Sequence, residues 1–515
     1  MPDTVPLSPV LFLDRAAAVF VDRNAIIDGD QRFTYREFQD RAHRLAGLLV
    51  DLGIRPGDRV AAICTNSHVM LEMHNGVPMA GAVLVPVNIR LSVPEMAFIV
   101  EHSGARLLVA TEELLEEAES VSKRTGVPLL AAGSQACEYE EGLAASVCNA
   151  VASINETSLL AINYTSGSTG RPKGVMYSHR GAYLQSLAIA YHARLGLDSS
   201  YLWTLPMFHC NGWCFTWAVT AAGGTHICAR RVDPAGLWLT ICNGGVTHLS
   251  GAPTLLTMIA EAANAMSDHK PARLIHVDTG GAPPSPALLA RLASLNMKVT
   301  HLYGLTETYG PAVVNEWHPE WSEKSVAEQL RLNARQGIGN IVTERASVLG
   351  SDGHEVPADG KTLGEIMIRG NNVMLGYYRD EDTTRDSQMN GWFRTGDLGV
   401  RHPDGYIELR DRAKDIIITG GENIASVEIE RVLVEHPAVL EAAVIGRADS
   451  HWGEVPVAFV VLRPGLTATE TELIDFVRGR IAHFKAPKEI RFEELPKTST
   501  GKVQKHVLRE RSAGL

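Results

Sequence analysis

A stretch of glycines, hydroxyls and one lysine between two apolar runs has the chemistry of a polyphosphate site. Its residues are Thr165, Ser166, Gly167, Ser168, Thr169, Gly170, Arg171, Pro172, Lys173 and Gly174. Glycines let backbone N–H groups approach an anion closely, hydroxyls donate hydrogen bonds, and the lysine adds a mobile positive charge. The flanking segments 159–164 and 174–178 predict two strands. The sequence therefore predicts a phosphate-binding loop between strands, with a flexible Gly/Ser hairpin as the alternative.

The spacing within this stretch differs from that of the common P-loop. That pattern needs a glycine, four residues, and then Gly-Lys-Ser/Thr. Here Pro172 lies five positions after Gly167, and Gly174 follows Lys173. A kinase or GTPase of the P-loop class is therefore disfavoured.

A second polar segment follows a predicted strand end. It consists of His301, Leu302, Tyr303, Gly304, Leu305, Thr306, Glu307 and Thr308. An aromatic ring can stack on adenine, a threonine can bond an α-phosphate, and a glutamate can hold Mg²⁺. Alone, the segment would be a strand end with a polar turn; beside the first motif it favours a site for ATP and Mg²⁺.

Two shorter segments add contacts for a nucleotide. Residues 279–284 follow a short predicted strand at 274–277 and by pattern form a Gly/Pro turn. In residues 392–398, Asp397 follows a glycine, where a carboxylate can accept both ribose hydroxyls, as an acidic residue does in dinucleotide folds.

The segment 205–214 contains His209, Cys210 and Cys214 and raises the question of zinc. No second cysteine pair stands at ligand spacing, so the pattern disfavours a metal site. The alternative is a core segment with a hydrogen-bonded histidine.

The elements that must position these residues alternate between strand and helix. Strands are predicted at 59–64, 82–87 and 107–110, and a helix begins in 33–38 with Ala42, Leu45, Ala46 and Leu49 on its apolar face. Ser178 can N-cap a helix with Leu184, Leu187, Ala188 and Tyr191 on one face. This alternation predicts an α/β fold with mostly parallel sheets. Residues 364–378 predict short strands of a small β-barrel subdomain, and 442–445 and 457–461 predict strands of a small α/β domain.

Composition narrows the class of protein. A chain of 515 residues is too long for one core. Its 45% hydrophobic and 21% charged residues are ordinary for a globular protein, and a net charge of −11 without a basic run argues against nucleic acid.

The uncharged segment 201–229 is long enough to span a bilayer, but it holds a proline, polar residues and three glycines. We therefore expect buried strand, loop and helix there, and no integral membrane association. Seven cysteines, an odd number, suggest reduced thiols, and 512–515 do not match a peroxisomal address, so a cytoplasmic location is expected.

Taken together, these segments resemble the adenylate-forming superfamily, which includes acyl-CoA synthetases, luciferases and peptide-synthetase adenylation domains. The resemblance runs from about Phe33 to Lys505, with each core motif in order. It implies a large N-terminal domain over 1–411 that binds ATP and the acid, made of parallel and mixed sheets with the small barrel. It also implies a small mobile α/β domain over 412–515, hinged at Lys414.

The resemblance assigns roles to individual residues. It places Gly280, Gly281, Ala282, Pro283, His301, Leu302 and Tyr303 around ATP together with the loop 165–173, Thr306, Asp397 and Arg412. The catalytic set is Lys502, Glu307, Thr306 and His209, in which Lys502 bridges the carboxylate and the α-phosphate while Glu307 and Thr165 hold Mg²⁺. The acyl pocket is formed by Phe208, His209, Trp213 and Gly304, and CoA is bound by Gly420, Gly421, Trp452, Phe484 and Lys488.

The reaction that the resemblance implies activates a carboxylic acid with ATP and passes the acyl group to coenzyme A. Amino-acid-activating relatives carry an aspartate where this chain has His209, so an acid without an α-amino group is expected. Trp213 favours a short-chain or medium-chain fatty acid or an aryl acid. Some relatives have an arginine where this chain has Ala486, which leaves the contacts of the CoA nucleotide open.

Two other functions stay open from sequence. The protein could load an acyl carrier protein, although no carrier domain follows Lys505, or it could bind ATP or an acyl group without catalysis. Both Glu307 and Lys502 are present, which speaks against loss of catalysis. The sequence also leaves open whether the chain forms a homo-oligomer.

Overall fold

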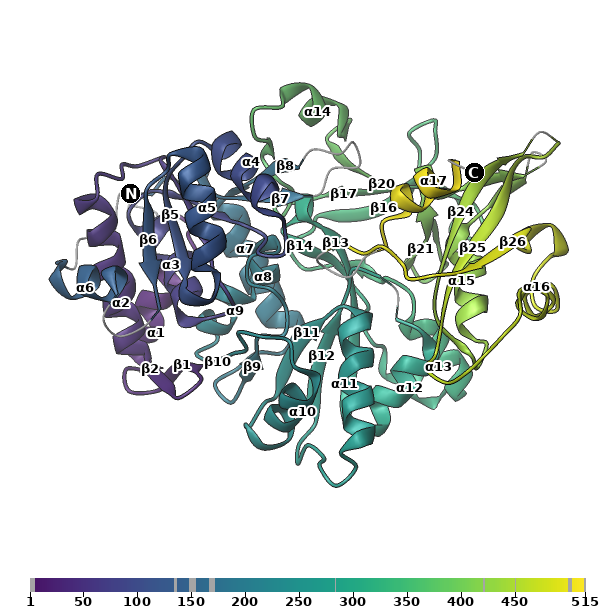
Figure 1. Ribbon diagram of the computed structural model, residues 1–515, viewed down its shortest axis with the longest axis horizontal. Coiled ribbons are helices and arrows are strands. Elements are labelled where there is room, and N and C mark those ends of the chain that lie inside the picture. The colour runs from purple at the N-terminus through teal and green to yellow at the C-terminus, as the bar shows by residue number, and fades with distance from the viewer. Residues whose placement is uncertain are drawn as a thin grey trace.

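The computed structural model describes residues 5–133, 137–147, 154–165, 172–282, 284–419, 422–449, 451–498 and 503–513. Within these ranges the chain forms four β-sheets surrounded by helices, which confirms the predicted α/β class (Figure 1). The two larger sheets share one hydrophobic core, and the last sheet is built from the C-terminal part of the chain.

The first large sheet has seven strands and contains the strands that flank the phosphate loop. Across the sheet they are β18 (Gly376–Tyr377), β8 (Lys173–Ser178), β7 (Leu159–Thr165), β4 (Val83–Pro86), β3 (Arg59–Ile63), β5 (Ala105–Thr111) and β6 (Leu129–Ala132). The strands β4, β3, β5 and β6 are parallel, while β8 and β18 are antiparallel to their neighbours. The central strands β3 and β4 are apolar apart from Arg59 at the start of β3, as expected when helices cover both faces.

The second large sheet has nine strands. Across the sheet they are β15 (Ile338–Gly339), β14 (Gly310–Val314), β13 (Met297–Leu305), β12 (Ile275–Thr279), β11 (His248–Gly251), β9 (Ser200–Leu202), β10 (Thr225–Cys228), β1 (Asn24–Asp28) and β2 (Gln31–Thr34). The six strands from β13 to β1 are parallel, so their carboxyl ends lie on one edge. That edge carries the segments 279–282 and 301–308, as expected for a ligand site in an α/β fold.

Two antiparallel-rich sheets complete the fold. The third contains β16 (Arg345–Leu349), β17 (Gly364–Arg369), β20 (Trp392–Arg401), β19 (Gln388–Met389) and β21 (Ile407–Arg412). The fourth contains β23 (Glu422–Ile424), β22 (Ile417–Thr419), β25 (Gly453–Leu462), β24 (Val439–Asp449) and β26 (Glu489–Phe492). The fourth sheet and its helices lie to one side of the larger sheets (Figure 1).

Helices cover the faces of the sheets. In the first half of the chain they are α1 (Leu11–Val19), α2 (Tyr35–Asp51), α3 (His68–Met79), α4 (Val93–Ser103), α5 (Leu115–Thr125), α6 (Glu138–Ala145), α7 (His179–His192), α8 (Cys210–Trp213), α9 (Phe215–Ala221) and α10 (Pro234–Asn243). Later come α11 (Pro253–Ala265), α12 (Pro286–Ser294), α13 (Val326–Asn333), α14 (Glu381–Asp386), α15 (Ser426–Val434), α16 (Glu470–Arg478) and α17 (Lys505–Ala513). Short 3₁₀ helices are η1 (Glu112–Leu114), η2 (Thr306–Thr308), η3 (Pro319–Glu323), η4 (Ala413–Asp415) and η5 (His483–Lys485).

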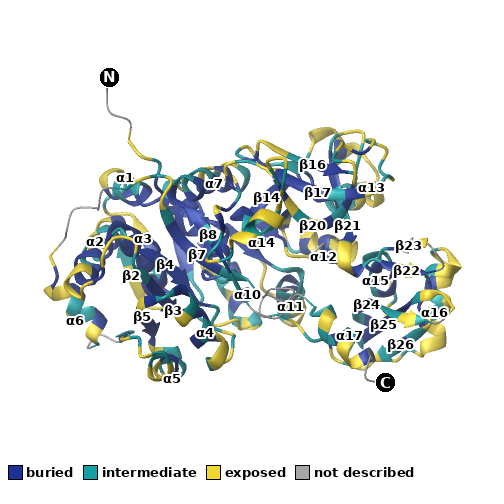
Figure 2. Cartoon of the chain, turned by 90° about the horizontal axis from the view of Figure 1, so that it is seen from above, coloured by how far each residue is buried: buried dark blue, intermediate teal, exposed yellow. Residues whose placement is uncertain are grey.

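The main core lies between the two large sheets. One face of each sheet packs there against residues of α2, α3, α7 and α9. The other face of the first sheet is covered by α4 and α5. The other face of the second sheet is covered by α10, α11 and α12. Figure 2 shows β4, β7 and β8 of the first sheet largely buried and the outer turns of the helices exposed. The site at the sheet edges therefore rests on a rigid interior.

Two helices test the sequence predictions in detail. Helix α2 begins after Thr34, whose hydroxyl accepts a hydrogen bond from the backbone N–H of Glu37 in a capping box, and its predicted apolar face is buried. Ser178 caps α7 as predicted, accepting from Gly181 N–H. The predicted apolar face of α7 is only partly confirmed, because Ala188 is buried but Leu187 and Tyr191 are 39% and 65% exposed, and the buried face carries mainly small and polar residues.

One predicted strand belongs to a different sheet. The segment 364–378 was expected to lie wholly in the small barrel, but only β17 joins the third sheet. Strand β18 pairs with β8 of the first sheet, with Gly376 opposite Met176 and Tyr377 opposite Val175. This pairing brings Tyr377 beside the phosphate-loop hairpin.

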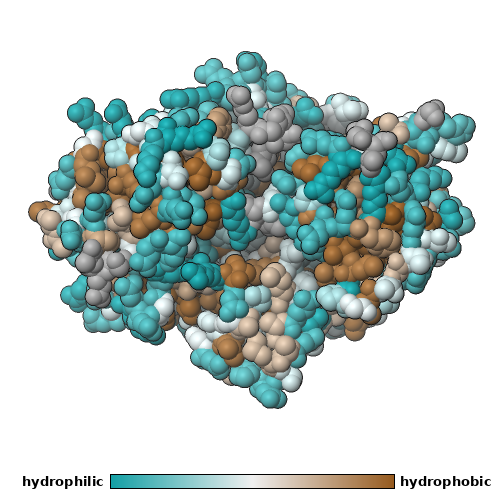
Figure 3. Space-filling model, viewed as in Figure 1, coloured by the Kyte–Doolittle hydropathy of each residue, from teal (hydrophilic) through white to brown (hydrophobic). Residues whose placement is uncertain are grey.

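Among the described residues, no helix is both long and apolar enough to cross a membrane. The charge-free segment 201–229 forms β9, α8, α9 and β10, as predicted. On the face drawn in Figure 3, apolar residues form separate patches among hydrophilic ones. The six described cysteines are free thiols.

One buried carboxyl in the second sheet has no charge partner. Asp278 lies on β12 opposite Ser250 of β11, and its side chain forms no ion pair or hydrogen bond with any residue that the structure describes. Burial raises the pKa of this carboxyl to about 7. The folded state therefore resists ionisation of Asp278.

We predict that Asp278→Asn stabilises the protein in a pH-dependent way. The folded pKa is raised from 3.8 to about 7, so wild-type stability falls as pH rises between these values and stays reduced above them. Asparagine removes this cost, a gain on the order of 4 kcal/mol at pH 8 and smaller at pH 5. Urea unfolding of both proteins at the two pH values measures the gain. An equal gain at pH 5 and pH 8 would contradict the assignment.

Candidate active site

The predicted phosphate loop is held by an antiparallel hairpin. Strand β7 ends at Thr165, strand β8 begins at Lys173, and the two residues are register partners. The ends of the loop are therefore fixed by the first sheet, as the sequence predicted. Residues Ser166, Gly167, Ser168, Thr169 and Gly170 of the loop lie outside the described residues.

Tyr377 links the lysine of this hairpin to the glutamate of the second motif. The Nζ atom of Lys173 lies 5.3 Å from the centre of the Tyr377 ring. The Tyr377 hydroxyl donates a hydrogen bond of 2.8 Å to Oε1 of Glu307. Burial, with Glu307 beside it, raises the pKa of Tyr377, so the phenol stays protonated and donates. The structure thus brings Lys173 and Glu307 to the same place from two different sheets.

A second cluster joins the aromatic residue of the second motif to the Thr-Gly-Asp segment. The hydroxyl of Tyr303 donates to Oδ2 of Asp397 at 2.8 Å, and Nε of Arg412 lies 3.2 Å from Oδ1 of Asp397. Burial, followed by the charge of Asp397, raises the pKa of Tyr303, which keeps it a donor. Three residues predicted to contact the nucleotide therefore meet, although they are up to 109 positions apart in the sequence.

The glycine turn follows β12 at the carboxyl edge of the second sheet. A side chain at Gly280 would lie 2.9 Å from the carbonyl oxygen of Leu302 and 3.1 Å from the indole of Trp213. Gly281 has a φ of +86°, which L side chains rarely adopt, and Ala282 is exposed. Pro283 lies outside the described residues. The turn therefore needs glycine both for its conformation and for close packing.

His301 lies on β13 at the carboxyl edge of the second sheet, and its ring bonds to the backbone of a neighbouring segment. Its ring is buried, and Nδ1 donates to the carbonyl oxygen of Arg335 at 3.0 Å. Burial lowers the pKa of His301 to about 4, so the imidazole is neutral at physiological pH. Any contact of this ring with a nucleotide would therefore involve a neutral imidazole.

The segment predicted to form the acyl pocket has an unusual backbone. Cys210, Asn211, Gly212, Trp213 and Cys214 all have positive φ, between 45° and 63°. Left-handed conformation costs roughly 1–2 kcal/mol for each residue with a side chain, so this turn stores several kcal/mol. Such strain persists only where surrounding contacts impose it, and it is common at functional sites.

Several contacts hold this turn against the second motif. The thiol of Cys210 lies 3.4 Å from Oγ1 of Thr306 and 3.6 Å from Nε2 of His209. The thiol of Cys214 contacts the carbonyl oxygen of Tyr309 at 3.7 Å. The predicted catalytic residues His209 and Thr306 are therefore neighbours through Cys210, a residue to which the sequence gave no role beyond a disfavoured zinc site.

Trp213 and three glycines pack closely together next to this turn. The indole of Trp213 is buried and lies against Gly280, and its backbone and ring contact Gly310 within 3.3 Å of where a side chain would begin. A side chain at Gly304 would start 2.0 Å from the carbonyl oxygen of Gly310, so only glycine fits there. Phe208 is buried beside the same turn.

Of the residues predicted to bind CoA, Trp452, Phe484 and Lys488 are described, and they lie on the surface of the loops around the fourth sheet. Trp452 and Phe484 are 45% and 43% exposed, which is unusual for large aromatic residues. Lys488 is exposed and has no carboxylate partner within the described chain, whereas Lys485 is held by Glu428 at 2.7 Å. Gly420 and Gly421 lie outside the described residues.

The predicted hinge residue Lys414 lies in η4, between β21 and β22. Its carbonyl oxygen accepts a hydrogen bond of 3.3 Å from Arg509 of α17, and Arg509 is also ion-paired with Asp415. The predicted catalytic Lys502 lies outside the described residues. Three positions later, Lys505 is partly buried and forms an ion pair with Glu430 of α15 at 2.7 Å.

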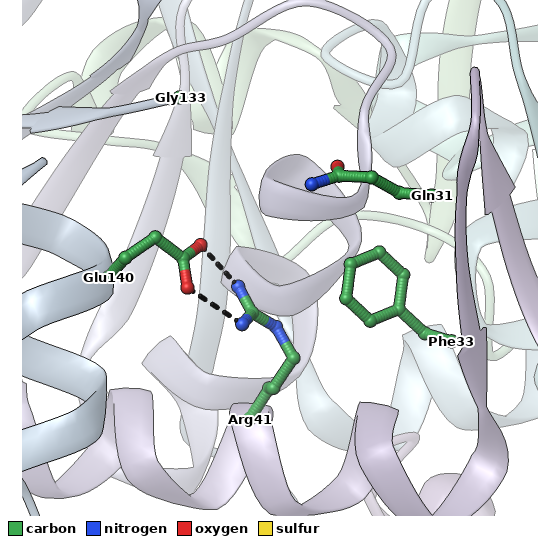
Figure 4. A pocket seen from close by; sticks show the side chains of 5 residues that line it. All are labelled: Gln31, Phe33, Arg41, Gly133 and Glu140. Carbon is green, nitrogen blue, oxygen red and sulfur yellow. Dashed lines mark hydrogen bonds and ion pairs between the residues drawn. The ribbon is translucent and has the colours of Figure 1, made fainter. Parts of the chain in front are cut away.

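A cavity of about 220 Å³ lies elsewhere, between β2, α2 and α6, and is lined by Gln31, Phe33, Arg41, Gly133 and Glu140 (Figure 4). Its cation is already paired, because Arg41 binds Glu140 at 2.7 Å and the buried Glu72 at 2.6 Å.

Among the described residues, no group of three or more His, Cys, Asp or Glu side chains is placed to hold a metal ion.

Sequence reasoning missed three residues of the site. Tyr377 belonged to a segment assigned to the barrel, and only the pairing of β18 with β8 brings it to Glu307. Asn163 and Asn211 are buried and bonded to each other, although 48 positions separate them. The only available signal was a polar residue within each of two otherwise apolar runs.

Comparison with known proteins gives the family. The model of the AMP-binding enzyme family matches residues 13–378, and that of the AMP-binding enzyme C-terminal domain matches residues 428–502. An acetate/butyrate–CoA ligase of Arabidopsis thaliana is 41% identical, and the match covers 98% of this chain and 94% of the relative. A 4-hydroxybutyrate–CoA ligase of Metallosphaera sedula is 40% identical, with coverage of 98% and 94%.

Solved structures agree with this result. ATP-bound MatB from Rhodopseudomonas palustris superposes with a TM-score of 0.85 at 28% identity, covering 98% of each chain. The o-succinylbenzoate CoA synthetase of Bacillus subtilis, solved with its acyl-adenylate intermediate, has a TM-score of 0.82 at 29% identity over 97% of each chain. The chain belongs to the AMP-binding enzyme family, in its acyl-CoA ligase branch.

Proposed function

We propose that this protein converts a short-chain or medium-chain carboxylic acid, or an aryl acid, to its CoA thioester. A carboxylate oxygen attacks the α-phosphorus of ATP and pyrophosphate leaves. The sulfur of CoA then attacks the acyl carbon, and AMP leaves as the acyl–oxygen bond breaks. The observation that carries the choice of acid is the packing of Trp213 against Gly280, which closes the pocket segment with a large apolar side chain.

The names of the relatives support the same class of acid. Two of them are called acetate–CoA and acetate/butyrate–CoA ligases, and others are named for 2-methylpropanoate and benzoate. His209 stands where an amino acid would need an acidic partner, and the segment around it is buried and apolar. An uncharged acyl tail fits these surroundings, since an unpaired charge would lose its hydration without compensation.

Within the site, the protein mainly positions groups and neutralises charge. We assign ribose binding to Asp397, which Tyr303 and Arg412 hold in place, and adenine packing to the turn 280–282. The loop 165–173 would bind the phosphates. Lys502 would bridge the carboxylate and the α-phosphate, and His209 and Thr306 would line the path between acid and nucleotide.

Mg²⁺ fits the donors at Glu307. This carboxylate is fixed by the Tyr377 hydroxyl, and Thr165 stands at the end of β7 beside the phosphate loop. Carboxylate and hydroxyl oxygens are the ligands that Mg²⁺ prefers, and the ion would neutralise charge on the phosphates. Glu307 and Thr165 are therefore our proposed protein ligands.

Coenzyme A is the favoured acceptor rather than a carrier protein. We assign its nucleotide to the exposed Trp452, Phe484 and Lys488, with Lys488 as the phosphate partner, and its thiol to the loop at Gly420 and Gly421. The free charge of Lys488 supports this choice, because the neighbouring Lys485 is already paired.

Free thiols in all six described cysteines agree with a cytoplasmic location.

We divide the chain into domains at 411/412, with the hinge at Lys414. Lys502 and Gly421 belong to the same small domain, and we propose that this domain presents them to the reacting centre one at a time. Rotation about Lys414 between the two half-reactions would bring each in turn, with a few residues absorbing the change.

Trp213→Ala tests the assigned pocket. We expect wild type to release AMP with acids of about two to six carbons. The variant should prefer octanoate over butyrate roughly tenfold or more strongly than wild type does, because each methylene accommodated in an apolar pocket is worth about 1–3 kcal/mol. CoA-dependent AMP release over a series of fatty and aryl acids measures this. Trp238→Ala, in the core beneath the other sheet face, is the control. Efficient use of long acids by wild type would reject the proposal.

Tyr377→Phe tests the metal site. Loss of one hydrogen bond to a charged carboxylate is worth about 1.5–3 kcal/mol, so the Mg²⁺ concentration for half-maximal adenylation should rise roughly 10-fold to 100-fold. Pyrophosphate exchange against Mg²⁺ concentration gives the value. Tyr378→Phe, the adjacent hydroxyl, should behave as wild type. If both variants shift equally, Tyr377 does not act through Glu307.

Lys502→Ala separates the half-reactions. It should abolish acyl-adenylate formation but still convert a supplied acyl-adenylate to the thioester. Gly421→Leu should do the reverse by obstructing the thiol, and Lys414→Pro should slow only thioester formation. Single-turnover measurements of each step are the test. Equal damage to both steps in Lys502→Ala and Gly421→Leu would leave alternation of the small domain without support.

A further inference from the structure

The left-handed turn 210–214 is tied to the phosphate-loop strand by one pair of amides. Asn163 lies on β7, two residues before Thr165, where the predicted phosphate loop begins. Its Nδ2 donates to Oδ1 of Asn211 at 2.5 Å, and its Oδ1 accepts from the backbone N–H of Asn211 at 3.0 Å. We call this pair of hydrogen bonds the amide clamp.

The orientation of the clamp is fixed by chemistry. A backbone N–H can only donate, so the atom of Asn163 that faces it must be the carbonyl oxygen. The NH₂ group of Asn163 therefore faces the side chain of Asn211, and Asn211 must present its own oxygen. Its Nδ2 is then left buried, with no partner among the described residues.

This arrangement is poorly suited to stability alone. Asn211 combines a left-handed backbone, with a φ of 45°, and a buried donor that no described group accepts. An apolar pair of similar shape would avoid the buried donor, and glycine would relieve the backbone. Strain of this kind points to a function that requires the geometry.

The clamp lies between the two substrates of the proposed reaction. On one side, Asn163 is continuous with the strand that enters the phosphate loop. On the other, the turn places Cys210 beside Thr306 and Trp213 against Gly280. A small shift of the turn relative to β7 would therefore change the distance between an acid in the pocket and the α-phosphate of ATP.

We propose that Asn163 and Asn211 are positioning residues for adenylation, which hold the acid pocket in register with the phosphate loop. The proposal rests on the assignment of residues 205–214 to the acid pocket. It predicts that the clamp affects use of the acid more than use of ATP, because β7 and β8 keep the ends of the loop in place without it.

Three variants test the clamp in the full-length enzyme. Asn163→Ala removes both hydrogen bonds. Asn211→Gly keeps the left-handed backbone and its N–H bond to Asn163 but removes the side-chain bond. The double variant shows whether the residues act as one unit. Asn75→Ala is the matched control, because Asn75 is a buried asparagine of α3 with one amide hydrogen bond and its own unpartnered oxygen.

ATP–pyrophosphate exchange with butyrate and octanoate gives KM for acid and for ATP separately. We expect the clamp variants to raise KM for the acid roughly tenfold or more and to lower kcat, with KM for ATP nearly unchanged. The double variant should be no worse than Asn163→Ala. Asn75→Ala should lower the melting temperature without moving either KM.

Three results would overturn the proposal. The first is an equal increase in KM for the acid and KM for ATP, and the second is additive effects in the double variant. The third is the same kinetic change in Asn75→Ala at a matched loss of melting temperature. Failure here is distinguishable from failure of the proposed substrate class. The latter is decided by wild type and Trp213→Ala across the acid series, whereas the clamp is decided by the ratio of acid and ATP effects in the asparagine variants.

Discussion

A stacked pair of tyrosines joins the two large sheets beneath the site. The rings of Tyr177 on β8 and Tyr309 after η2 lie 3.9 Å apart, and the Tyr177 hydroxyl donates to the carbonyl oxygen of Thr306 at 2.5 Å. The Tyr309 hydroxyl in turn accepts from the backbone N–H of Ser178. A side chain at Gly181 would lie 2.5 Å from the Tyr309 ring, so the helix after β8 must approach closely. Because the phosphate loop belongs to one sheet and Glu307 to the other, their distance depends on this contact.

The sequence predicted the strands and the polar segments well, because these depend on local pattern. The apolar runs around 159–178 became β7 and β8, and the segment 301–308 became a strand end followed by η2. The α7 helix shows where pattern fails. Its leucines were expected to face the core, but the close approach of Tyr309 at Gly181 turns small and polar residues inward and leaves Tyr191 exposed. The spacing of large apolar residues predicts the buried face of a helix only when the neighbouring element does not require small residues on that face.

Contacts between distant segments could not be predicted in the same way. Tyr377 contacts Glu307 only because a two-residue strand crosses to another sheet, and no local signal distinguishes such a strand from one that stays in the barrel. The carboxyl of Asp278 gives a similar case, since burial in the folded interior raises its pKa and its neighbours in sequence do not reveal that burial. A contact that depends on strand pairing, or a pKa shift that depends on burial, can therefore be identified only from the structure.

The distribution of strain and rigidity fits a two-substrate reaction. Strands β7 and β8 are paired up to Thr165 and Lys173, so ATP would meet the end of a paired hairpin, whereas the acid would meet a turn in which Cys210, Trp213 and Cys214 adopt a left-handed conformation that their side chains disfavour. A turn of this kind has its conformation imposed by contacts with Asn163, Thr306 and Tyr309. Asn163 is two residues before Thr165, and Thr306 and Tyr309 lie on either side of Glu307, so the same contacts lie next to the proposed phosphate loop and the proposed metal ligand. Acid specificity can then change through residues of the turn itself, such as Trp213, while the contacts that align acid with nucleotide stay in place.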